Sequence, residues 1–130
     1  MAYEVVVGRD LTQEMKIAGQ TLLARLDPAT FTAALWLFLS EAGTWRYVLA
    51  SPSVGQTGSR PLYEAVDNAS TTLGLNESTI SLQDIAIVGD SDLTIRLLRL
   101  ATRVQPPMEV RFARNTIQGH YIEDAYIYKL

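Results

Sequence analysis

The chain contains no cysteine, only one histidine and only two lysines among its 130 residues. The absence of cysteine excludes disulfides, thiol catalysis and thiolate metal sites. A single histidine, His120, excludes a metal motif built on two imidazoles and leaves one imidazole for acid–base chemistry. The chemistry available to this chain is therefore narrow, and the sequence favours a protein that is not an enzyme.

Long apolar runs are also missing. No run is long enough to cross a bilayer, and residues 1–10 carry neither a basic leader nor the apolar core of a signal peptide. These features predict a cytoplasmic protein without a membrane partner. Hydrophobic residues make up 48% of the chain and charged residues 19%, which is enough apolar material for a packed core. At this length we expect one domain over residues 1–130.

Basic residues are fewer than acidic ones, 11 against 14, which gives a formal net charge of −3. A negative chain repels a nucleic-acid backbone, so nucleic-acid binding would need a local basic patch. One such patch is suggested at residues 96–114, where the spacing of Arg96, Arg99 and Arg103 predicts that they line one side of a helix. It is either a surface for a partner or nucleic acid, or a solvated helix face with internal ion pairs. Its members are Arg96, Arg99, Arg103, Arg111 and Arg114.

Apolar residues recur at helical spacing in three segments, residues 10–27, 60–74 and 92–105. Asp10 is the predicted N-cap of the first helix, and the polar segment Asp90-Ser91-Asp92 can cap the third. The second helix has a proline in its first turn and a glycine at its end, and Pro106-Pro107 closes the third. The predicted buried face of the third helix comprises Leu93, Leu97, Leu100, Ala101 and Val104.

Two further stretches, residues 31–39 and 45–50, are rich in apolar and aromatic side chains and are joined by a five-residue turn containing glycine. The first has large apolar residues on both faces, which predicts a strand covered on both sides and paired with the second in a hairpin. Residues 85–88 predict another strand. Residues 110–116 and 120–128 predict a second hairpin joined at residues 115–119.

The order of elements is helix, hairpin, helix, strand, helix, hairpin. It predicts an α+β domain with three helices, a mixed or mainly antiparallel sheet of about five strands, and one crossover connection. Val5, Val6 and Val7 either open a further short strand or pack on the first helix, because three residues show no decisive period.

A pattern within residues 34–63 resembles one found in small bacterial proteins of unassigned function. It consists of Ala34-Leu35-Trp36, Glu41-x-Gly43-x-Trp45-Arg46, Ala50-Ser51-Pro52, Gly58 and Tyr63. The resemblance implies a bacterial α+β domain, and it implies no activity, cofactor or site residue.

The loop at residues 51–60 is the strongest candidate for a ligand site. It leads from a strand into a helix N-terminus, where free N–H groups and the helix dipole favour a phosphate or carboxylate. It lacks the spacing of a P-loop or a dinucleotide fingerprint, and strand-to-helix loops need flexible and capping residues for local reasons as well. The candidate ligand-binding residues are Ser51, Ser53, Gly55, Gly58, Ser59 and Arg60.

Acidic residues follow the strand at residues 85–88, in the segment 90–92. Two carboxylates there could hold a hard cation, but helix capping explains them equally, and no further oxygen ligands lie nearby in sequence. We therefore predict no metal site and no cofactor. A triad of Ser51 or Ser53 with His120 and Asp124 can be assembled on paper, but no nucleophile-elbow motif surrounds either serine, so no catalytic residue is assigned.

Aromatic side chains are concentrated in the predicted strands, where they form either the core or an exposed interface. The interface candidates are Trp36, Trp45, Tyr121, Tyr126 and Tyr128. The leading hypothesis is a non-catalytic interaction or assembly module of a bacterial cytoplasmic system that forms homo-oligomers or binds a protein partner. The alternatives are a small ligand-binding domain or enzyme using residues 51–60, and a weak nucleic-acid binder using the arginines.

Overall fold

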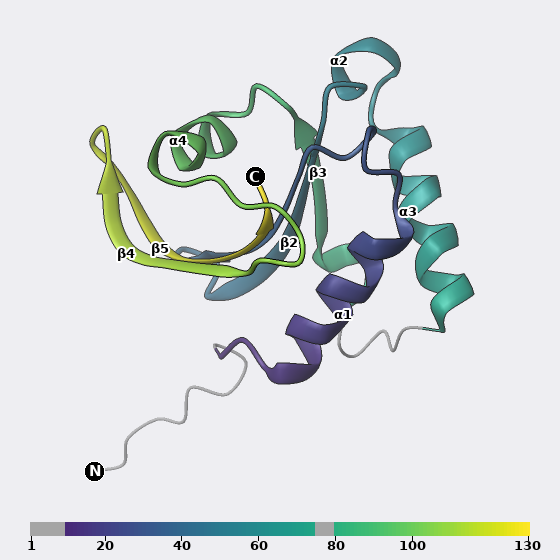
Figure 1. Cartoon of the computed structure of the whole chain (residues 1–130), viewed down its shortest axis with the longest axis horizontal. Coiled ribbons are helices and arrows are strands. Elements are labelled where there is room, and N and C mark those ends of the chain that lie inside the picture. The colour runs from purple at the N-terminus through teal and green to yellow at the C-terminus, as the bar shows by residue number, and fades with distance from the viewer. Residues whose placement is uncertain (1–9, 75–79) are drawn as a thin grey trace.

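The computed structural model of the chain describes residues 10–74 and 80–130. Its three longer helices and five strands occur in the predicted order, which confirms the α+β class (Figure 1). Residues 5–7, for which a short strand or packing on the first helix was left open, lie outside the described residues. The elements are α1 (Gln13–Arg25), β1 (Ala33–Leu39), β2 (Thr44–Ser51), α2 (Val54–Thr57), α3 (Arg60–Leu73), η1 (Leu82–Asp84), β3 (Ile85–Gly89), α4 (Leu93–Ala101), β4 (Val110–Ile117) and β5 (His120–Lys129).

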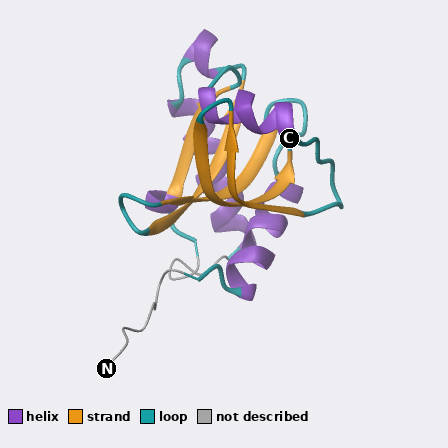
Figure 2. Cartoon of the chain, turned by 90° about the vertical axis from the view of Figure 1, so that its left-hand side faces the viewer, coloured by secondary structure: helices purple, strands orange, loops and turns teal. Residues whose placement is uncertain are grey.

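The five strands form one sheet in the order β3-β2-β1-β5-β4. All neighbours are antiparallel except β2 and β3, which are parallel and are joined through α3 by the expected crossover. Helices α1 and α3 pack together on one face, and α4 lies on the other face, within the curve of the β4–β5 hairpin (Figure 1). Figure 2 shows how strongly the strands twist and curve.

Strand β1 is central and covered on both faces, as its sequence predicts. Trp36 belongs to the core under α1 and α3, whereas Leu35 belongs to the core under α4, and both side chains are fully buried. The same alternation continues on β2, where Tyr47 and Val48 pack into opposite cores. The two cores thus share one sheet, which positions α1, α3 and α4 relative to one another.

Helix α1 approaches the sheet closely because three aromatic side chains donate hydrogen bonds to its backbone carbonyls. The pairs are Trp36 Nε1 to Met15 O at 3.1 Å, Tyr47 Oη to Gly19 O at 2.7 Å and Tyr128 Oη to Lys16 O at 2.7 Å. Gly19 is necessary at this contact, because a Cβ atom there would lie 2.6 Å from the Tyr128 hydroxyl and 2.8 Å from Trp36 Nε1. These three aromatic side chains therefore hold α1 against the sheet.

The N-cap of α1 is Thr12, and the prediction of Asp10 was wrong. The Thr12 hydroxyl accepts a hydrogen bond from Met15 N at 3.1 Å, which satisfies one of the free amides of the first turn. Threonine and aspartate are both good N-caps, so sequence spacing alone did not distinguish them.

The buried face of α4 also differs from the predicted one. Leu93 and Leu100 are 49% and 64% exposed, and the buried residues of the helix are Ile95, Leu97 and Leu98. The helix ends at Ala101, so the proline pair that was expected to close it lies in the following loop. The orientation of α4 is set by contacts to β1 and β3, described below, which the helical period alone does not contain.

The second hairpin has a tighter turn than predicted. Its strands continue to Ile117 and from His120, leaving only Gln118 and Gly119 between them. Both turn residues have positive φ, 50° and 84°, as two-residue hairpin turns that match the sheet twist require.

Candidate functional site

The two loops singled out in the sequence meet at one end of the sheet. β2 and β3 run parallel, and Ser51 at the end of β2 pairs with Gly89 at the end of β3. After β2 the chain leads to α3 on one face, and after β3 it leads to α4 on the opposite face. Such a divergence at the carboxyl ends of parallel strands is where α/β proteins bind ligands. Residues 51–60 and 90–92 therefore form one candidate site.

A polar network of three side chains lies at this end. The Thr32 hydroxyl donates to the carboxylate of Asp90, and Arg99 Nη1 lies 3.1 Å from Asp90 Oδ1. The guanidinium also donates to Thr32 O at 3.2 Å and to Asp90 O at 3.4 Å. The hydrogen bond from Thr32, helped by Arg99, holds the pKa of Asp90 below its usual value. The network ties together the start of β1, the end of β3 and α4.

One atom of this network is unsatisfied. Arg99 Nε is buried and has no hydrogen-bond partner among the described residues. An unpaired buried donor is costly, so the ion pair and the two carbonyl contacts of the same guanidinium must offset it.

Local structure explains much of the serine and glycine content of the loop. Ser51 is fully buried, and its Oγ accepts a hydrogen bond from Ser53 N at 3.1 Å. Ser53 precedes the single turn of α2, which contains Gly55. Gly58 ends that turn with φ of +81°, a conformation that other residues rarely adopt.

The start of α3 carries the remaining two loop candidates. Ser59 is the N-cap residue, but its side chain makes no capping hydrogen bond. Arg60 lies on the surface, with Nε 3.6 Å from Glu64 Oε2 in an ion pair along the helix. Arg60 thus shares its charge with Glu64.

The acidic segment after β3 is used for structure. Asp92 caps α4, with Oδ2 accepting from Thr94 N at 3.1 Å and from Ile95 N at 3.4 Å. Within residues 10–74 and 80–130, no group of three histidine or acidic side chains is placed to hold a metal ion.

Two members of the triad considered in the sequence have other surroundings. His120 is exposed beside the hairpin turn, and Asp124 binds Arg111.

Two of the five arginines of the predicted basic surface are committed to internal ion pairs. Arg99 binds Asp90, as described above, and Arg111 makes two hydrogen bonds to Asp124, at 2.8 Å and 2.6 Å. The Asp124 carboxylate raises the pKa of Arg111, whose guanidinium also lies over the Trp45 ring at 5.6 Å. Internal pairing, the second interpretation of the sequence, therefore applies to these two residues.

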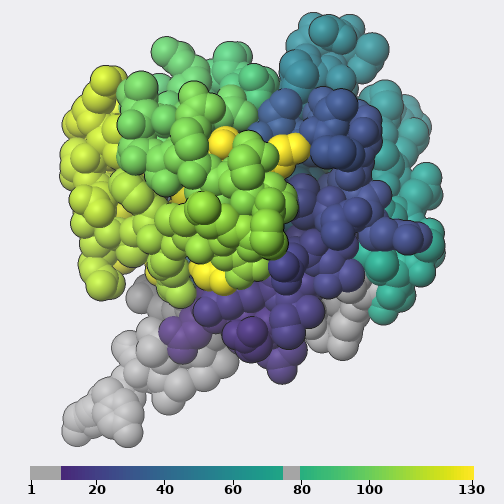
Figure 3. All heavy atoms as spheres, viewed as in Figure 1, coloured from purple at the N-terminus to yellow at the C-terminus, as the bar shows by residue number. Residues whose placement is uncertain are grey.

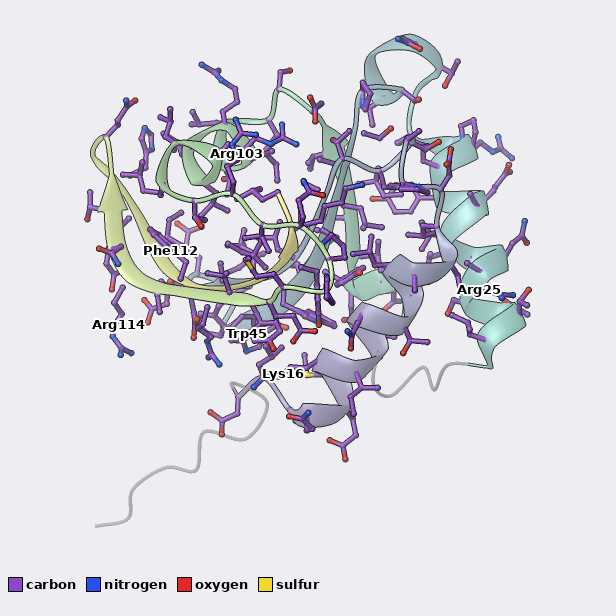
Figure 4. All side chains as sticks on the ribbon, viewed as in Figure 1. Lys16, Arg25, Trp45, Arg103, Phe112 and Arg114 are labelled. Atoms are coloured by element: carbon purple, nitrogen blue, oxygen red, sulfur yellow. The ribbon has the colours of Figure 1, made fainter. Side chains whose placement is uncertain are left out.

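The other arginines do not share one helix face. Arg103 lies beyond the end of α4, and Arg114 lies within β4. Figure 4 shows Arg103 beside α4 and Arg114 on the outer side of the β4–β5 hairpin. Arg96 is exposed on α4. Arg96, Arg99 and Arg103 thus do not form the helix-face stripe that their spacing predicts, because α4 ends before Arg103 and Arg99 binds Asp90.

Most of the interface candidates belong to the core. Trp36, Trp45 and Tyr128 are 0%, 4% and 2% exposed, so they do not form an exposed aromatic face. Tyr126 is half-buried and donates a hydrogen bond to the Glu109 carboxylate. Burial raises the pKa of Tyr126 to about 12, with the Glu109 carboxylate as the second cause. Tyr121 is 57% exposed.

A groove that the sequence did not indicate lies between α1 and the loop after α4. It has a volume of about 280 Å³, and residues near the C-terminus form its floor (Figure 3). Glu109 and Lys129 are its charged residues, and Met108 on its lip is 55% exposed. We call it the α1–proline groove; its apolar walls include Leu23, Ala24, Leu26, Pro106, Pro107 and Met108. A sequence signal did exist, because Pro106, Pro107 and Met108 form an apolar run in a loop.

A second cavity of about 360 Å³ lies where the β1–β2 turn approaches the start of β5. Leu37, Leu39 and Tyr121 contribute apolar surface, whereas Glu41 and Glu123 contribute acidic groups. It combines apolar and acidic walls without a cluster of reactive groups.

Comparisons of this chain with protein family models, with curated proteins and with solved structures find no match. Among the described residues, no helix combines the length and apolar character needed to span a membrane.

Proposed function

We propose that this chain is a non-catalytic interaction module that self-associates through the α1–proline groove. The observation that carries the proposal is an apolar groove, open to solvent, whose own lip presents an exposed methionine, Met108. Methionine is flexible and polarisable and suits adaptable contact surfaces. The bacterial, cytoplasmic setting expected from the sequence is part of this proposal.

The groove has the properties of half of a two-fold interface. In such an interface a residue i of one copy meets residue j of the other while j meets i, so every contact away from the two-fold axis occurs twice. The rim charges are already engaged within the chain: Glu109 accepts from Tyr126, and Lys129 Nζ donates to two backbone carbonyls between α1 and β1, at 2.8 Å and 2.9 Å. Two grooves placed face to face would therefore meet through their apolar walls, with Met108 of each copy entering the other. A second copy supplies the apolar side chain that such a groove accepts.

The size of the groove favours a protein side chain over a small molecule. Pockets for small-molecule ligands have volumes of about 300–1,000 Å³, and this groove lies just below that range. Interfaces between proteins commonly use smaller pockets that accept one apolar anchor.

The use of the charged side chains supports a non-catalytic role. Asp90 and Asp124 are bound to arginines, Asp92 caps a helix, and Glu109 accepts from a tyrosine. Each of these carboxylates serves the fold, whereas a general acid or base needs to face a substrate.

The first test replaces Met108 with aspartate and measures solution mass by light scattering over a range of protein concentrations. We expect the unmodified chain to form a dimer and Met108→Asp to raise the dissociation constant at least tenfold, about 1.4 kcal/mol, because a charge then enters an apolar contact. Leu82→Asp is the matched control, since Leu82 is also exposed and apolar, at 44%, but is not part of the groove. A monomeric unmodified chain, or a Met108→Asp variant that dimerises normally, would contradict the proposal.

A second candidate function is the binding of a small anion at the carboxyl ends of β2 and β3. The pairing of Ser51 with Gly89 and the divergence of α3 and α4 at this point favour it. Titration with inorganic phosphate, followed by amide chemical shifts, should then give saturable changes at Ser53 and Asp90. Shifts spread evenly over the surface would indicate non-specific binding and count against the site.

A further inference from the structure

Among residues 10–74 and 80–130, β3 is an edge strand, because it pairs with β2 on one side and ends the sheet on the other. Its sequence, Ile85 to Gly89, is uncharged and largely β-branched. An edge of this kind presents unpaired N–H and C=O groups that another strand can bind. Short, uncharged, β-branched segments are also those most prone to pair with copies of themselves.

The side chain of Tyr63, from α3, occupies this edge. Its hydroxyl accepts a hydrogen bond from Ile87 N at 3.0 Å and lies 3.5 Å from Ile85 O, to which it donates. In an extended strand the C=O of one residue and the N–H two residues later point to the same side. These are the two groups that the next strand of a sheet would bind, so one hydroxyl replaces a neighbouring strand at the middle of β3.

The opposite edge of the sheet is interrupted in a different way. Within β4, Arg114 has φ of +50°, and the regular pairing with β5 skips this residue between Ala113 and Asn115. A left-handed residue in the middle of a strand breaks the regular row of backbone groups that strand addition needs. Both edges of the sheet are therefore modified at their centres.

We propose that Tyr63 is an autoinhibitory cap that prevents β3 from pairing with β3 of a second copy. Two identical strands related by a two-fold axis pair antiparallel, with the same length and the same uncharged side chains on each side. A second copy is thus the occupant that the composition of the edge selects. This inference is independent of the α1–proline groove, because it rests on a different surface.

The test removes only the hydroxyl, by Tyr63→Phe, in a Met108→Asp background that disables the groove. The ring is retained, so its packing against the core under α3 is preserved. At low protein concentration we expect the Ile87 amide to exchange with solvent at least tenfold faster than in Met108→Asp alone. In the same background Tyr63→Ala also removes the ring from the edge, and at high concentration we expect that variant to form a dimer in which the Ile87 amide is protected again.

Two controls make the result specific. The Leu49 amide, in the interior of the sheet, serves as an internal reference that should not change if the fold is intact. Tyr121→Phe removes the hydroxyl of an exposed tyrosine and should change neither exchange at Ile87 nor solution mass. Unchanged exchange at Ile87 in the Tyr63→Phe variant, or a folded Tyr63→Ala variant that stays monomeric at every concentration, would overturn the inference.

Discussion

At the scale of single residues, Gly19 shows how one position controls the docking of a helix. Its missing side chain lets the backbone of α1 come within hydrogen-bonding distance of Trp36, Tyr47 and Tyr128. Burial raises the pKa of both tyrosine hydroxyls, which remain protonated donors to the helix carbonyls. A glycine inside a helix is usually unfavourable, so the close contact must compensate for its flexibility.

We therefore predict that Gly19→Ala destabilises the protein by about 1–3 kcal/mol, the usual cost of overpacking a core. The added methyl group would overlap the Tyr128 hydroxyl and Trp36 Nε1, both held by hydrogen bonds. Urea unfolding measures the change. Gly55→Ala is the control, because a Cβ atom there meets nothing within 4 Å, and its effect should stay within about 0.5 kcal/mol. Equal effects of the two substitutions would contradict this account.

At the scale of elements, the network of Thr32, Asp90 and Arg99 determines how α4 sits on the sheet. It joins β1, β3 and α4 through one ion pair and two bonds to backbone carbonyls. Drawing Arg99 toward the sheet turns Leu93 and Leu100 outward, which accounts for the incorrect prediction of the buried face.

The lowered pKa of Asp90 predicts a dependence of stability on pH. In the unfolded chain the aspartate has a pKa of about 3.9, so its contribution is complete above that pH and is lost as the pH falls through the lower folded value. At neutral pH, Asp90→Asn should cost about 1 kcal/mol, a modest figure because the carboxylate is 39% exposed and solvent screens it.

Urea unfolding at pH 7 and at a series of pH values below 4 checks this prediction. The difference between the unmodified chain and Asp90→Asn should shrink as the pH falls. Asp67→Asn, an exposed change on α3, should stay within about 0.5 kcal/mol at neutral pH. A difference for Asp90→Asn that persists in full at the lowest pH would show that the charge of the carboxylate is not responsible.

At the scale of the whole molecule, the surfaces available for association are few. Tyr63 occupies the free edge of β3, and Arg114 interrupts the edge of β4. The aromatic residues expected at an interface are largely buried. The α1–proline groove is the apolar surface that the proposed self-association uses.

If the groove forms a two-fold interface, association must stop at two copies, because both grooves are then filled. We expect the solution mass to reach a plateau at twice 14.4 kDa as the concentration increases. Continued growth of the mass would instead indicate head-to-tail contacts, which do not close. Variation of the salt concentration adds a check, since a contact made by apolar walls should not weaken at high salt.

The positions of the helices and strands could be predicted from the sequence because they follow from local patterns. The alternation around Trp36 predicts a strand covered on both sides, and Pro61 and Gly74 mark the ends of α3. The choice of Thr12 over Asp10 as a cap could not be predicted, because both residues suit that position. The α1–proline groove was missed because its walls come from α1, the loop after α4 and the C-terminus, which are distant in sequence.

By itself, the sequence determined the α+β class, the order of the elements and the absence of thiol chemistry, because these depend on composition and short-range periodicity. Only the tertiary structure decided that the loops after β2 and β3 meet, that Arg99 and Arg111 are paired, and that Trp36 and Tyr128 serve the core. The physical reason is that burial and pairing depend on contacts between residues far apart in the chain, which no local pattern specifies.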